Sequence, residues 1–287
     1  MRVSRVSASL QPWNSATTLY IARKIQELAA GRALSVLDMG CGEGRVLEQL
    51  LSLGHRLHGF DLPDKREALR RNLGPVFGDL FDARVRVMDD ERCIPFPDAA
   101  FDVVYANQVF EHVRFLDPML AECARVLKPG GTLIALFPLA TCIVEGHVLV
   151  PFAHWVPPGT VRQRYLAAFL ALSSRRRFPG RSVFGSAVEW DDRLRHFTFY
   201  RFINEITAVF EHYFETSHVD ADGYVQAKVD LLKARGGARR RLGARLLRVL
   251  QGPRLSAFVT HGFMGVFCAT GPTDITARHR VVPWRHE

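Results

Sequence analysis

Residues 36–44 read VLDMGCGEG, and this short stretch indicates the architecture more strongly than any other part of the chain. An apolar run ends at Asp38, and three glycines follow at every second position. Glycines allow the backbone to turn tightly and to approach a ligand without a Cβ in the way. Residues 44–54 then have the apolar spacing of a helix, whose first turn would present free amide groups to the same ligand. The stretch therefore predicts a strand, a ligand-binding loop and a helix.

Strand and helix patterns alternate outward from this loop. We expect strands at 35–40, 56–62, 83–90, from 101, at 131–138, 215–225 and 262–270. We expect helices at 13–30, 44–54, near 64–72, at 116–131, near 161–173 and at 200–214. Such alternation predicts an α/β fold: a Rossmann-like, doubly wound sheet of seven strands, mostly parallel, with an antiparallel last strand.

The domain organisation follows from where this pattern loosens. We expect residues 1–287 to form a single domain with two insertions. Residues 139–200 are rich in Pro, His, Trp and Arg, and they follow the fifth strand, so they should cover the carboxyl edge of the sheet as a substrate cap. Residues 226–256 form the second insertion, which is strongly basic.

The positive charge is concentrated in that second insertion. The net charge is +9, yet residues 1–138 carry 17 basic and 17 acidic side chains, whereas 228–254 carry nine basic residues against Asp230 alone. Leucines near helical spacing accompany the arginines. Three interpretations stay open: a helix docked on anionic membrane lipid, capture of an anionic acceptor or RNA, or a solvated helix that covers the sheet edge.

Cysteine usage and hydropathy bear on the compartment. The five cysteines are odd in number and show no CxxC spacing, which argues against a disulfide framework and a zinc site, so we expect no metal. The N-terminal residues lack an apolar stretch long enough for a signal peptide. The longest apolar run, 132–144, is interrupted by Pro138 and is too short to span a bilayer. We expect a cytoplasmic protein.

Four motifs in order resemble those of class I S-adenosylmethionine-dependent methyltransferases, and the subgroup with the ubiquinone/menaquinone-type enzymes is the most similar. These motifs are VLDMGCGEGRV at 36–46, FDL at 60–62, DERCIPFPDAAFDVVYANQVFEHV at 90–113 and ARVLKPGGTLIALFP at 124–138. The resemblance covers residues 35–138 and implies S-adenosyl-L-methionine as cofactor. A nicotinamide fingerprint would instead require a small residue at the position of Arg45.

The resemblance also implies roles for individual residues. The methionine part of the cofactor would be surrounded by Asp38, Gly40, Cys41 and Gly42. Asp61 would bind the ribose, Asp90 would lie near the adenine amino group, with Asp89 as a competitor, and Asn107 would lie beside the transferable methyl. Three of these residues also have a purely structural alternative. Asp61 could cap the following turn, Asp90 could be an exposed turn residue, and Asn107 could satisfy backbone groups at the strand end.

Histidines are the candidates for proton transfer. The cofactor methyl is already electrophilic, so the main task is alignment, but a hydroxyl acceptor also needs a base. His147 and His154 lie in EGHVLVPFAHWVPPG (145–159), directly after the fifth strand, where an acceptor pocket must be covered. We predict that at least one of them faces the methyl site, although either could anchor the loop. His112 is the alternative candidate base, although a histidine at this position more often packs or caps than catalyses.

The acceptor is expected to be a small molecule, with an oxygen on a sugar, polyketide or lipid-linked precursor as the leading hypothesis. Nucleic acid is disfavoured, because the run after the fourth strand, 107–110, lacks the prolines typical of amino-directed nucleic-acid methylation. Cys142 lacks the Pro-Cys partner motif of RNA cytosine methylation. The rival hypotheses are an RNA methyltransferase, aided by the basic segment, and a catalytically silent cofactor-binding partner protein.

Overall fold

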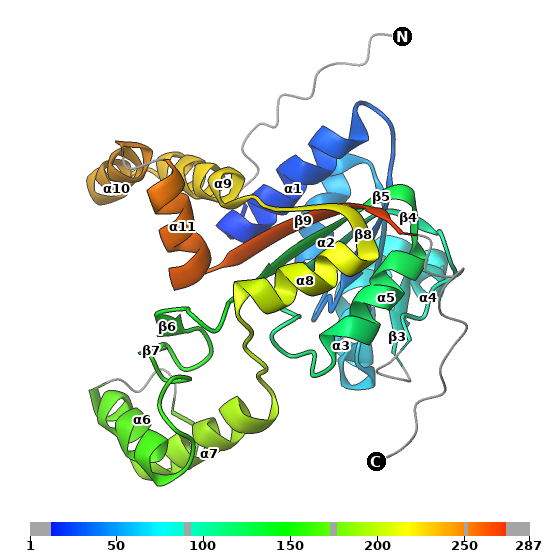
Figure 1. The fold of residues 1–287 in the computed structure, drawn as a ribbon. Coiled ribbons are helices and arrows are strands. Elements are labelled where there is room, and N and C mark those ends of the chain that lie inside the picture. The colour runs from blue at the N-terminus through cyan, green and yellow to red at the C-terminus, as the bar shows by residue number, and fades with distance from the viewer. Residues whose placement is uncertain (1–12, 89–92, 173–176, 250–251, 274–287) are drawn as a thin grey trace.

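The computed structural model describes residues 13–88, 93–172, 177–249 and 252–273 (Figure 1). The strands are β1 (Ser35–Met39), β2 (Arg56–Asp61), β3 (Val85–Val87), β4 (Phe101–Asn107), β5 (Leu127–Phe137), β6 (Val144–Glu145), β7 (Val150–Pro151), β8 (Phe214–Val219) and β9 (Gly265–Pro272). The α-helices are α1 (Ala16–Ala29), α2 (Arg45–Leu50), α3 (Arg66–Phe77), α4 (Phe81–Arg84), α5 (Leu116–Val126), α6 (Thr160–Leu172), α7 (Val183–His196), α8 (Ile203–Tyr213), α9 (Ala221–Ala234), α10 (Ala238–Val249) and α11 (Pro253–Gly262). The short 3-10 turns are η1 (Leu51–Leu53), η2 (Pro63–Lys65) and η3 (Gly78–Leu80).

Seven strands form one sheet in the order β3-β2-β1-β4-β5-β9-β8, which confirms the predicted fold class. All neighbouring pairs from β3 to β5 are parallel, and β9 is antiparallel to both β5 and β8. The chain runs outward from β1 to β3 and then returns to place β4 on the other side of β1. The point between β1 and β4 is therefore the topological switch point, where ligands bind in open α/β sheets.

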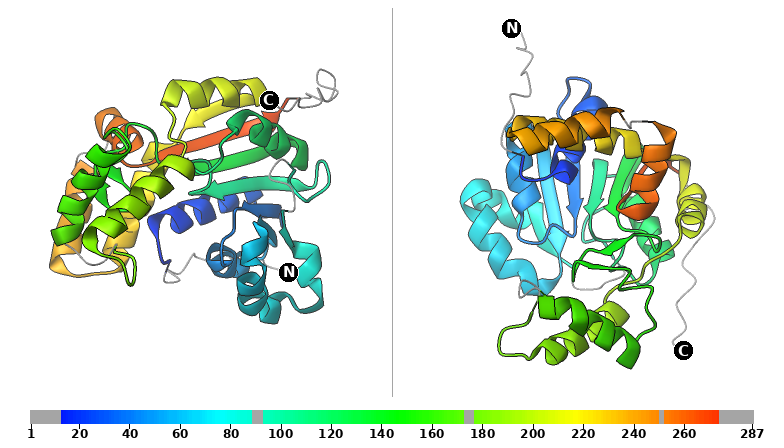
Figure 2. Two further views of the ribbon diagram at one scale, coloured as in Figure 1. Left: turned by 90° about the horizontal axis from the view of Figure 1, so that it is seen from below. Right: turned by 90° about the vertical axis from the view of Figure 1, so that its left-hand side faces the viewer.

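Helices cover both faces of this sheet (Figure 2). Alternate strand residues point to opposite faces, so Val104 and Ala106 of β4 pack in the cluster with α5 and α8, whereas Val103 and Tyr105 pack in the cluster with α1, α2, α3 and α9. Because both faces are buried there, the central strands contain uninterrupted apolar runs, such as 133–137 in β5.

Residues 139–200 lie beyond the sheet and contain a short β6–β7 hairpin and the helix pair α6–α7 (Figure 1). This segment has an apolar cluster of its own, built around Val150, Leu166 and Leu194. A buried ion pair joins the two helices, with Arg162 Nε 2.6 Å from Asp191 Oδ1. Helix α7 was not predicted from the sequence; Ser182 starts it by accepting a hydrogen bond from the Gly185 amide.

The described residues of the basic segment 226–256 belong to the second part of α9, to α10 and to the start of α11, on the side of the molecule where the β6–β7 hairpin also lies (Figure 2). Gly236 and Gly237 both have positive φ and separate α9 from α10. Leu247 packs near the buried Ala244, but Leu242 and Leu246 are 59% and 54% exposed, so the leucine face of α10 is only partly covered. Within the described residues, no helix combines the length and apolar character needed to cross a membrane.

Several predicted boundaries were wrong for local reasons. Helix α5 ends at Val126 and not at 131, because Leu127 already pairs with Phe101 in the sheet and begins β5. The strand expected at 215–225 stops at Val219, since the Asp220 carboxylate accepts from the Gly223 amide at 3.0 Å and starts α9. Likewise β3 begins only at Val85, after the helical turn α4.

Candidate functional site

The loop after β1 can form only with glycine at two of its positions. Gly40 and Gly44 have φ of +68° and +81°, and a Cβ on them would lie 2.6 Å from Val109 Cγ2 and 2.5 Å from Leu73 Cδ1. Gly42 also has a positive φ of +58°, but a Cβ there would meet nothing within 4 Å. The outer two glycines therefore allow tight packing, whereas Gly42 leaves open space in front of its backbone.

Asp61, at the end of β2, is tied to this loop. Its Oδ2 accepts from the Gly42 amide at 2.5 Å, and its Oδ1 accepts from the Leu62 amide at 2.8 Å. The amides of Gly40 and Cys41 both donate to the Phe60 carbonyl at 3.0 Å. The two strand ends thus hold the loop in a fixed shape, and the partly exposed Asp61 carboxylate lies at its rim. Both the predicted ribose role and the turn-capping alternative are compatible with this position.

Buried polar groups surround the ends of β1 and β4. Among the described residues, Asn107 Oδ1 is buried and has no hydrogen-bond partner, whereas the buried Asp38 carboxyl group and Tyr105 hydroxyl share a hydrogen bond with each other. Burial raises the pKa of Asp38 well above its usual range, and the charge of Asp61 adds to this effect. Burial likewise raises the pKa of the Cys41 thiol, so this residue is neutral and not a nucleophile. Buried polar atoms are normally paired, which suggests a ligand as the missing partner of Asn107 Oδ1.

An open hollow lies at this position and brings together most of the predicted cofactor residues. Its lining residues are Gly40, Cys41, Gly42, Glu43, Arg45, Val46 and Asn107. The backbone in front of Gly42 is unobstructed, the Asp61 carboxylate is at the rim, and Asn107 offers an unpaired amide oxygen. A polar ligand with a ribose and an amino-acid part fits this donor and acceptor set.

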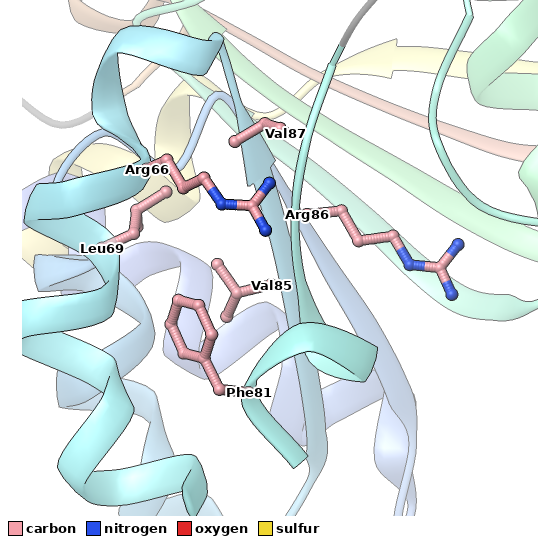
Figure 3. Close-up of a pocket in the computed structure, with 6 residues that line it drawn as sticks. All are labelled: Arg66, Leu69, Phe81, Val85, Arg86 and Val87. Atoms are coloured by element: carbon pink, nitrogen blue, oxygen red, sulfur yellow. The ribbon is translucent and has the colours of Figure 1, made fainter. Parts of the chain in front are cut away.

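A second hollow has no such features (Figure 3). It lies between α3, α4 and β3 and is lined by Arg66, Leu69, Phe81, Val85, Arg86 and Val87. Its space is roughly that of one water molecule. It therefore has no room for a cofactor or an acceptor.

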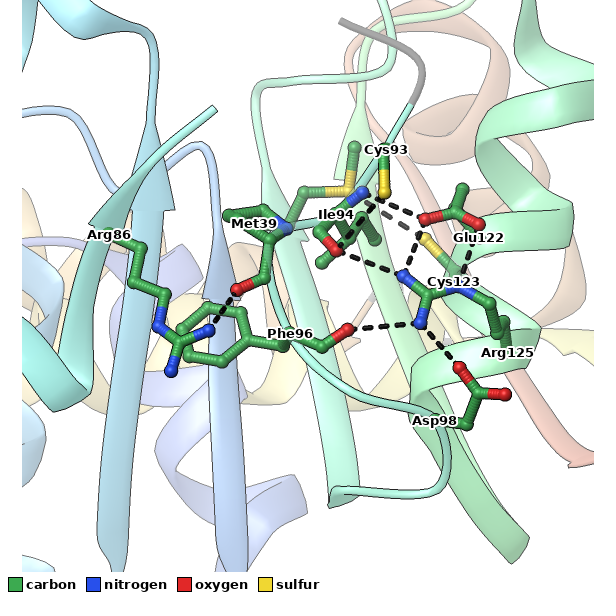
Figure 4. A network of polar contacts seen from close by, with 10 residues as sticks. Met39, Arg86, Cys93, Ile94, Phe96, Asp98, Glu122, Cys123 and Arg125 are labelled. Carbon is green, nitrogen blue, oxygen red and sulfur yellow. Dashed lines mark hydrogen bonds and ion pairs between the residues drawn. The ribbon is translucent and has the colours of Figure 1, made fainter. Parts of the chain in front are cut away.

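Asp90 and its competitor Asp89 lie outside the described residues, so their predicted adenine role stays a prediction. The segment that follows them is firmly held (Figure 4). Arg125 of α5 donates to the carbonyls of Ile94 and Phe96 at 2.9 and 3.0 Å and forms an ion pair with Asp98 at 2.6 Å. This network fixes the chain between residue 93 and the start of β4.

A cluster of titratable side chains forms where the turn after β4 meets the β6–β7 hairpin. Glu111, His112 and His147 each bring one polar atom within 4.8 Å of the others. The two imidazole Nε2 atoms are 3.2 Å apart. His147 Nδ1 lies 2.6 Å from Glu145 Oε1, and the Tyr200 hydroxyl donates to the same oxygen at 2.6 Å. The chain thus brings two imidazoles and two carboxyl groups together: Glu111 and His112 from the turn after β4, and Glu145 and His147 from the β6–β7 hairpin.

The two carboxyl groups of the cluster differ in charge. Burial raises the pKa of Glu111 to about 7, and both of its carboxyl oxygens lack hydrogen-bond partners among the described residues. Burial also opposes ionisation of Glu145, but hydrogen bonds from His147, Tyr200 and the Val148 amide outweigh it and lower the pKa of this group. Glu145 is therefore ionised at neutral pH, whereas Glu111 is close to half-protonated.

His154 has a different environment from His147. Its Nε2 lies 3.1 Å from the Ala140 carbonyl and 3.6 Å from Cys142 Sγ, and its ring packs on Tyr200. Trp155 donates to the same Ala140 carbonyl at 2.7 Å. Burial raises the pKa of Cys142 to about 12, so its thiol stays neutral. These contacts anchor the start of the cap, which was the alternative role considered for His154.

Arg201 joins the cap to the turn that carries Glu111 and His112. Its guanidinium donates to four backbone carbonyls, at distances between 2.6 and 3.2 Å: Phe110, Val113, Arg114 and Phe199. The Phe199 amide in turn donates to the Glu111 carbonyl at 2.7 Å. The backbone position of the cluster is therefore fixed from both sides.

Comparison with known proteins agrees with this geometry. Residues 37–135 match the family described as "Methyltransferase domain". Ubiquinone biosynthesis O-methyltransferase from Caulobacter vibrioides is 31% identical over 150 residues, which are 48% of this chain and 58% of that protein. The mitochondrial human protein of the same name is 37% identical over 105 residues, 35% of this chain and 27% of that protein. The chain thus spans between about a quarter and three-fifths of these relatives.

Residues 37–135 form a class I S-adenosylmethionine-dependent methyltransferase domain that is similar in sequence to the ubiquinone-type enzymes, and the cofactor of this domain is S-adenosyl-L-methionine. The structure of the YcgJ protein from Bacillus subtilis aligns over 90% of this chain and 100% of that chain, with 15% identity and a TM-score of 0.48.

Three residues of the titratable cluster were not assigned from the sequence. Glu111 precedes His112 in FEHV. An acidic residue directly after Phe110 was the sequence signal that could have marked it as a site residue. Glu145 was noted only as a neighbour of His147. Tyr200 lies 55 residues from its partner Glu145, so no local pattern could connect them.

Proposed function

We propose that the chain transfers a methyl group from S-adenosyl-L-methionine to an oxygen of a small-molecule acceptor. The observation that carries this proposal is the titratable cluster of Glu111, His112, Glu145 and His147. Its first two residues come shortly after the end of β4, where Asn107 lines the hollow. A hydroxyl acceptor must lose a proton, and imidazole groups held by carboxylates are suited to take it. The names of the relatives from Caulobacter vibrioides and human describe O-methyltransferases, which favours oxygen as the acceptor atom here.

The cofactor would be held by the residues of the hollow. Gly42 offers backbone without side-chain obstruction, Asp61 offers a carboxylate for ribose hydroxyls, and Asn107 offers an unpaired oxygen. When bound, the cofactor supplies an electrophilic methyl carbon on a cationic sulfur. The residues of the chain then have to align the acceptor oxygen with that carbon at about 3–3.5 Å.

His147 is the better of the two predicted bases. Its Nδ1 is engaged by the Glu145 carboxylate, so its Nε2 is the nitrogen that can receive a proton. His154 uses Nε2 to contact the Ala140 carbonyl and is therefore proposed as an anchor. With the cofactor bound, the methyl carbon would exchange its bond to sulfur for a bond to the acceptor oxygen, which leaves a neutral thioether, and the His147 imidazole would take the proton of the acceptor hydroxyl.

The cap and the rest of the chain complete the proposal. We place residues 1–287 in one functional unit, with 139–200 as a substrate cap and 226–256 as a basic insertion. Phe152 and Trp155 stack at 4.9 Å and are 40% and 53% exposed, so the cap offers apolar surface to an acceptor. A sugar, polyketide or lipid-linked precursor is the proposed acceptor, and the cytoplasm is the proposed location.

A lipid-linked acceptor is compatible with the basic segment. Arg240, Arg241 and Arg245 of α10 are exposed beside the exposed Leu242 and Leu246. Basic and apolar side chains together are typical of a helix that lies on an anionic membrane. We therefore propose peripheral contact through 228–254, and we rank RNA as an acceptor below it, since exposed leucines contribute nothing to phosphate binding.

Transfer of a radiolabelled methyl group tests this function. The chain is incubated with labelled S-adenosyl-L-methionine and separate panels of phenols, sugars, polyketides, lipid-linked phenols and RNA, and the methylated atom is identified. We expect an O-methyl product, and replacement of His147 by Ala should lower the rate by about 10²–10⁴ while cofactor affinity is retained. The matched variant His154→Ala should cost much less.

Two outcomes would contradict the proposal. Label found on nitrogen, carbon or RNA would reject the oxygen acceptor. Tight cofactor binding with no transfer to any panel would favour the catalytically silent partner protein.

A further inference from the structure

The hydrogen bonds around His112 and His147 define which ring nitrogen of each carries the proton. His112 Nδ1 lies 2.5 Å from the backbone carbonyl of Phe197, which can only accept, so Nδ1 must donate. His147 Nδ1 lies 2.6 Å from the ionised carboxylate of Glu145, which also accepts. A neutral imidazole that donates from Nδ1 has its lone pair on Nε2. Both rings therefore present an acceptor nitrogen.

These two acceptor nitrogens face each other. The Nε2 atoms of His112 and His147 are 3.2 Å apart, which is the length of a hydrogen bond, yet two lone pairs at that distance repel. We propose that His112 and His147 take up one shared proton between their Nε2 atoms, and that this pair accepts the proton released by the methyl acceptor. This proposal rests on the proposed function and adds His112 to the catalytic residues.

The charges around the pair favour a single added proton. The ionised Glu145 compensates the positive charge that the pair would gain, and the Tyr200 hydroxyl donates to the same carboxylate oxygen that His147 contacts. Glu111, in the turn after β4, adds negative charge when it ionises near neutral pH. Desolvation lowers the pKa of His112, so this ring is neutral when the pair is empty.

The remaining polar groups of the cap do not compete for this proton. His154 is engaged with the Ala140 carbonyl, and Cys142 is a neutral thiol. Arg201, whose charge would oppose protonation, is directed at backbone carbonyls. Glu145 and Tyr200 are therefore positioning residues, since they act on the reaction only through the orientation and charge of His147.

The proton has a route in and out of the pair. As the O–CH₃ bond forms, the C–S bond breaks and the acceptor proton moves into the Nε2–Nε2 position. His112 is exposed, so solvent can remove the proton after turnover. Each cycle thus removes the added proton, while the Phe197 carbonyl and the Glu145 carboxylate keep the remaining proton of each ring on Nδ1.

Imidazole NMR tests the pair without any need for turnover. Long-range ¹H–¹⁵N spectra of the full chain, recorded between about pH 5 and 9, report the protonation of each ring nitrogen. We expect Nδ1 of both residues to stay protonated and both Nε2 signals to shift together at one midpoint. His112→Phe should lower the midpoint of His147 by about 1 to 2 pH units, because a hydrogen bond to the charged form is lost. His218→Ala, on the exposed face of β8, is the control and should change nothing.

The pH profile of methyl transfer provides the second measurement. The acid limb of kcat/KM should move to lower pH in His112→Phe, while Tyr200→Phe should move it by less. Independent titration of the two rings would overturn the proposal even if methyl transfer occurs, so this failure is distinct from failure of the proposed function. Inhibition by a chelator together with Nε2 shifts on Zn²⁺ addition would also overturn it, by showing that a metal ion and not a proton lies between the rings.

Discussion

Buried polar atoms without protein partners are concentrated in one region of the described chain. They are Asn107 Oδ1, both carboxyl oxygens of Glu111 and His154 Nδ1. All of them belong to β4, to the turn after β4 or to the cap. An unpaired buried polar atom is costly, so residues at this edge are arranged for a ligand rather than for stability alone.

Asp61 provides the first prediction at this scale. Asp61→Ala should weaken S-adenosyl-L-methionine binding by roughly 1–3 kcal/mol, the range for hydrogen bonds to a charged group. Part of the loss would come from the Gly42 amide, which donates to Asp61 at 2.5 Å and would lose its acceptor. Calorimetry measures the affinity, and Asp64→Ala, an exposed neighbour paired with Lys65, is the control. Equal affinity in the Asp61 variant and the wild type would remove this residue from the site.

Glu111 should make the stability depend on pH. Burial raises its pKa from 4.5 to about 7, so the folded state keeps the carboxyl neutral while the unfolded state ionises it. The contribution of Glu111 to the free energy of unfolding is therefore fully present below pH 4.5, and it is lost progressively as the pH rises to about 7. The shift corresponds to about 3–4 kcal/mol. Denaturant titrations should show Glu111→Gln gaining stability over the wild type across that window, and a constant difference would argue against the raised pKa.

Among the elements, the cap helices α6 and α7 depend on one buried ion pair. Arg162 and Asp191 are each about 5% exposed or less, and Asp191 also accepts from the Gly159 amide and from Gln163. Removing one partner leaves a buried charge uncompensated, which typically costs about 3–5 kcal/mol. Asp191→Ala should therefore speed amide exchange in α6 and α7 while β4 and β5 stay protected. Asp192→Ala, at the exposed adjacent position, should leave exchange unchanged; equal effects of both variants would refute the role of the pair.

Helix α10 allows a test of the membrane proposal. Vesicles with anionic lipid should bind the chain at low salt and release it as salt is added, because exposed charges are screened. Replacing both Leu242 and Leu246 by Ser should lower binding roughly tenfold or more, since their exposed apolar area would no longer enter the lipid interface. The matched control is Val76→Ser with Leu80→Ser, which are similarly exposed near α3. Failure to bind anionic vesicles at low salt would leave α10 as a cover for the sheet edge.

At the scale of the whole molecule, the sheet and its loop could be predicted from sequence, but the cap could not. The apolar run before Asp38 and the glycines after it are local signals, and the structure confirms β1, the loop and α2 there. The pairing of Glu145 with Tyr200 and the packing of α7 on α6 depend on contacts between distant segments. Sequence periodicity does not encode such contacts, so only the histidines, and not their partners, were anticipated.

Thermal unfolding with S-adenosylhomocysteine tests the central claim most directly, because we propose that the hollow binds this product in the folded domain. At a concentration of about 100 times its dissociation constant, it should stabilise the folded chain by about 2.7 kcal/mol and raise the unfolding temperature. NAD at the same concentration should have no effect, and Asp61→Ala should reduce the shift caused by S-adenosylhomocysteine. A stabilisation by NAD, or none by S-adenosylhomocysteine or S-adenosyl-L-methionine at any accessible concentration, would contradict the account.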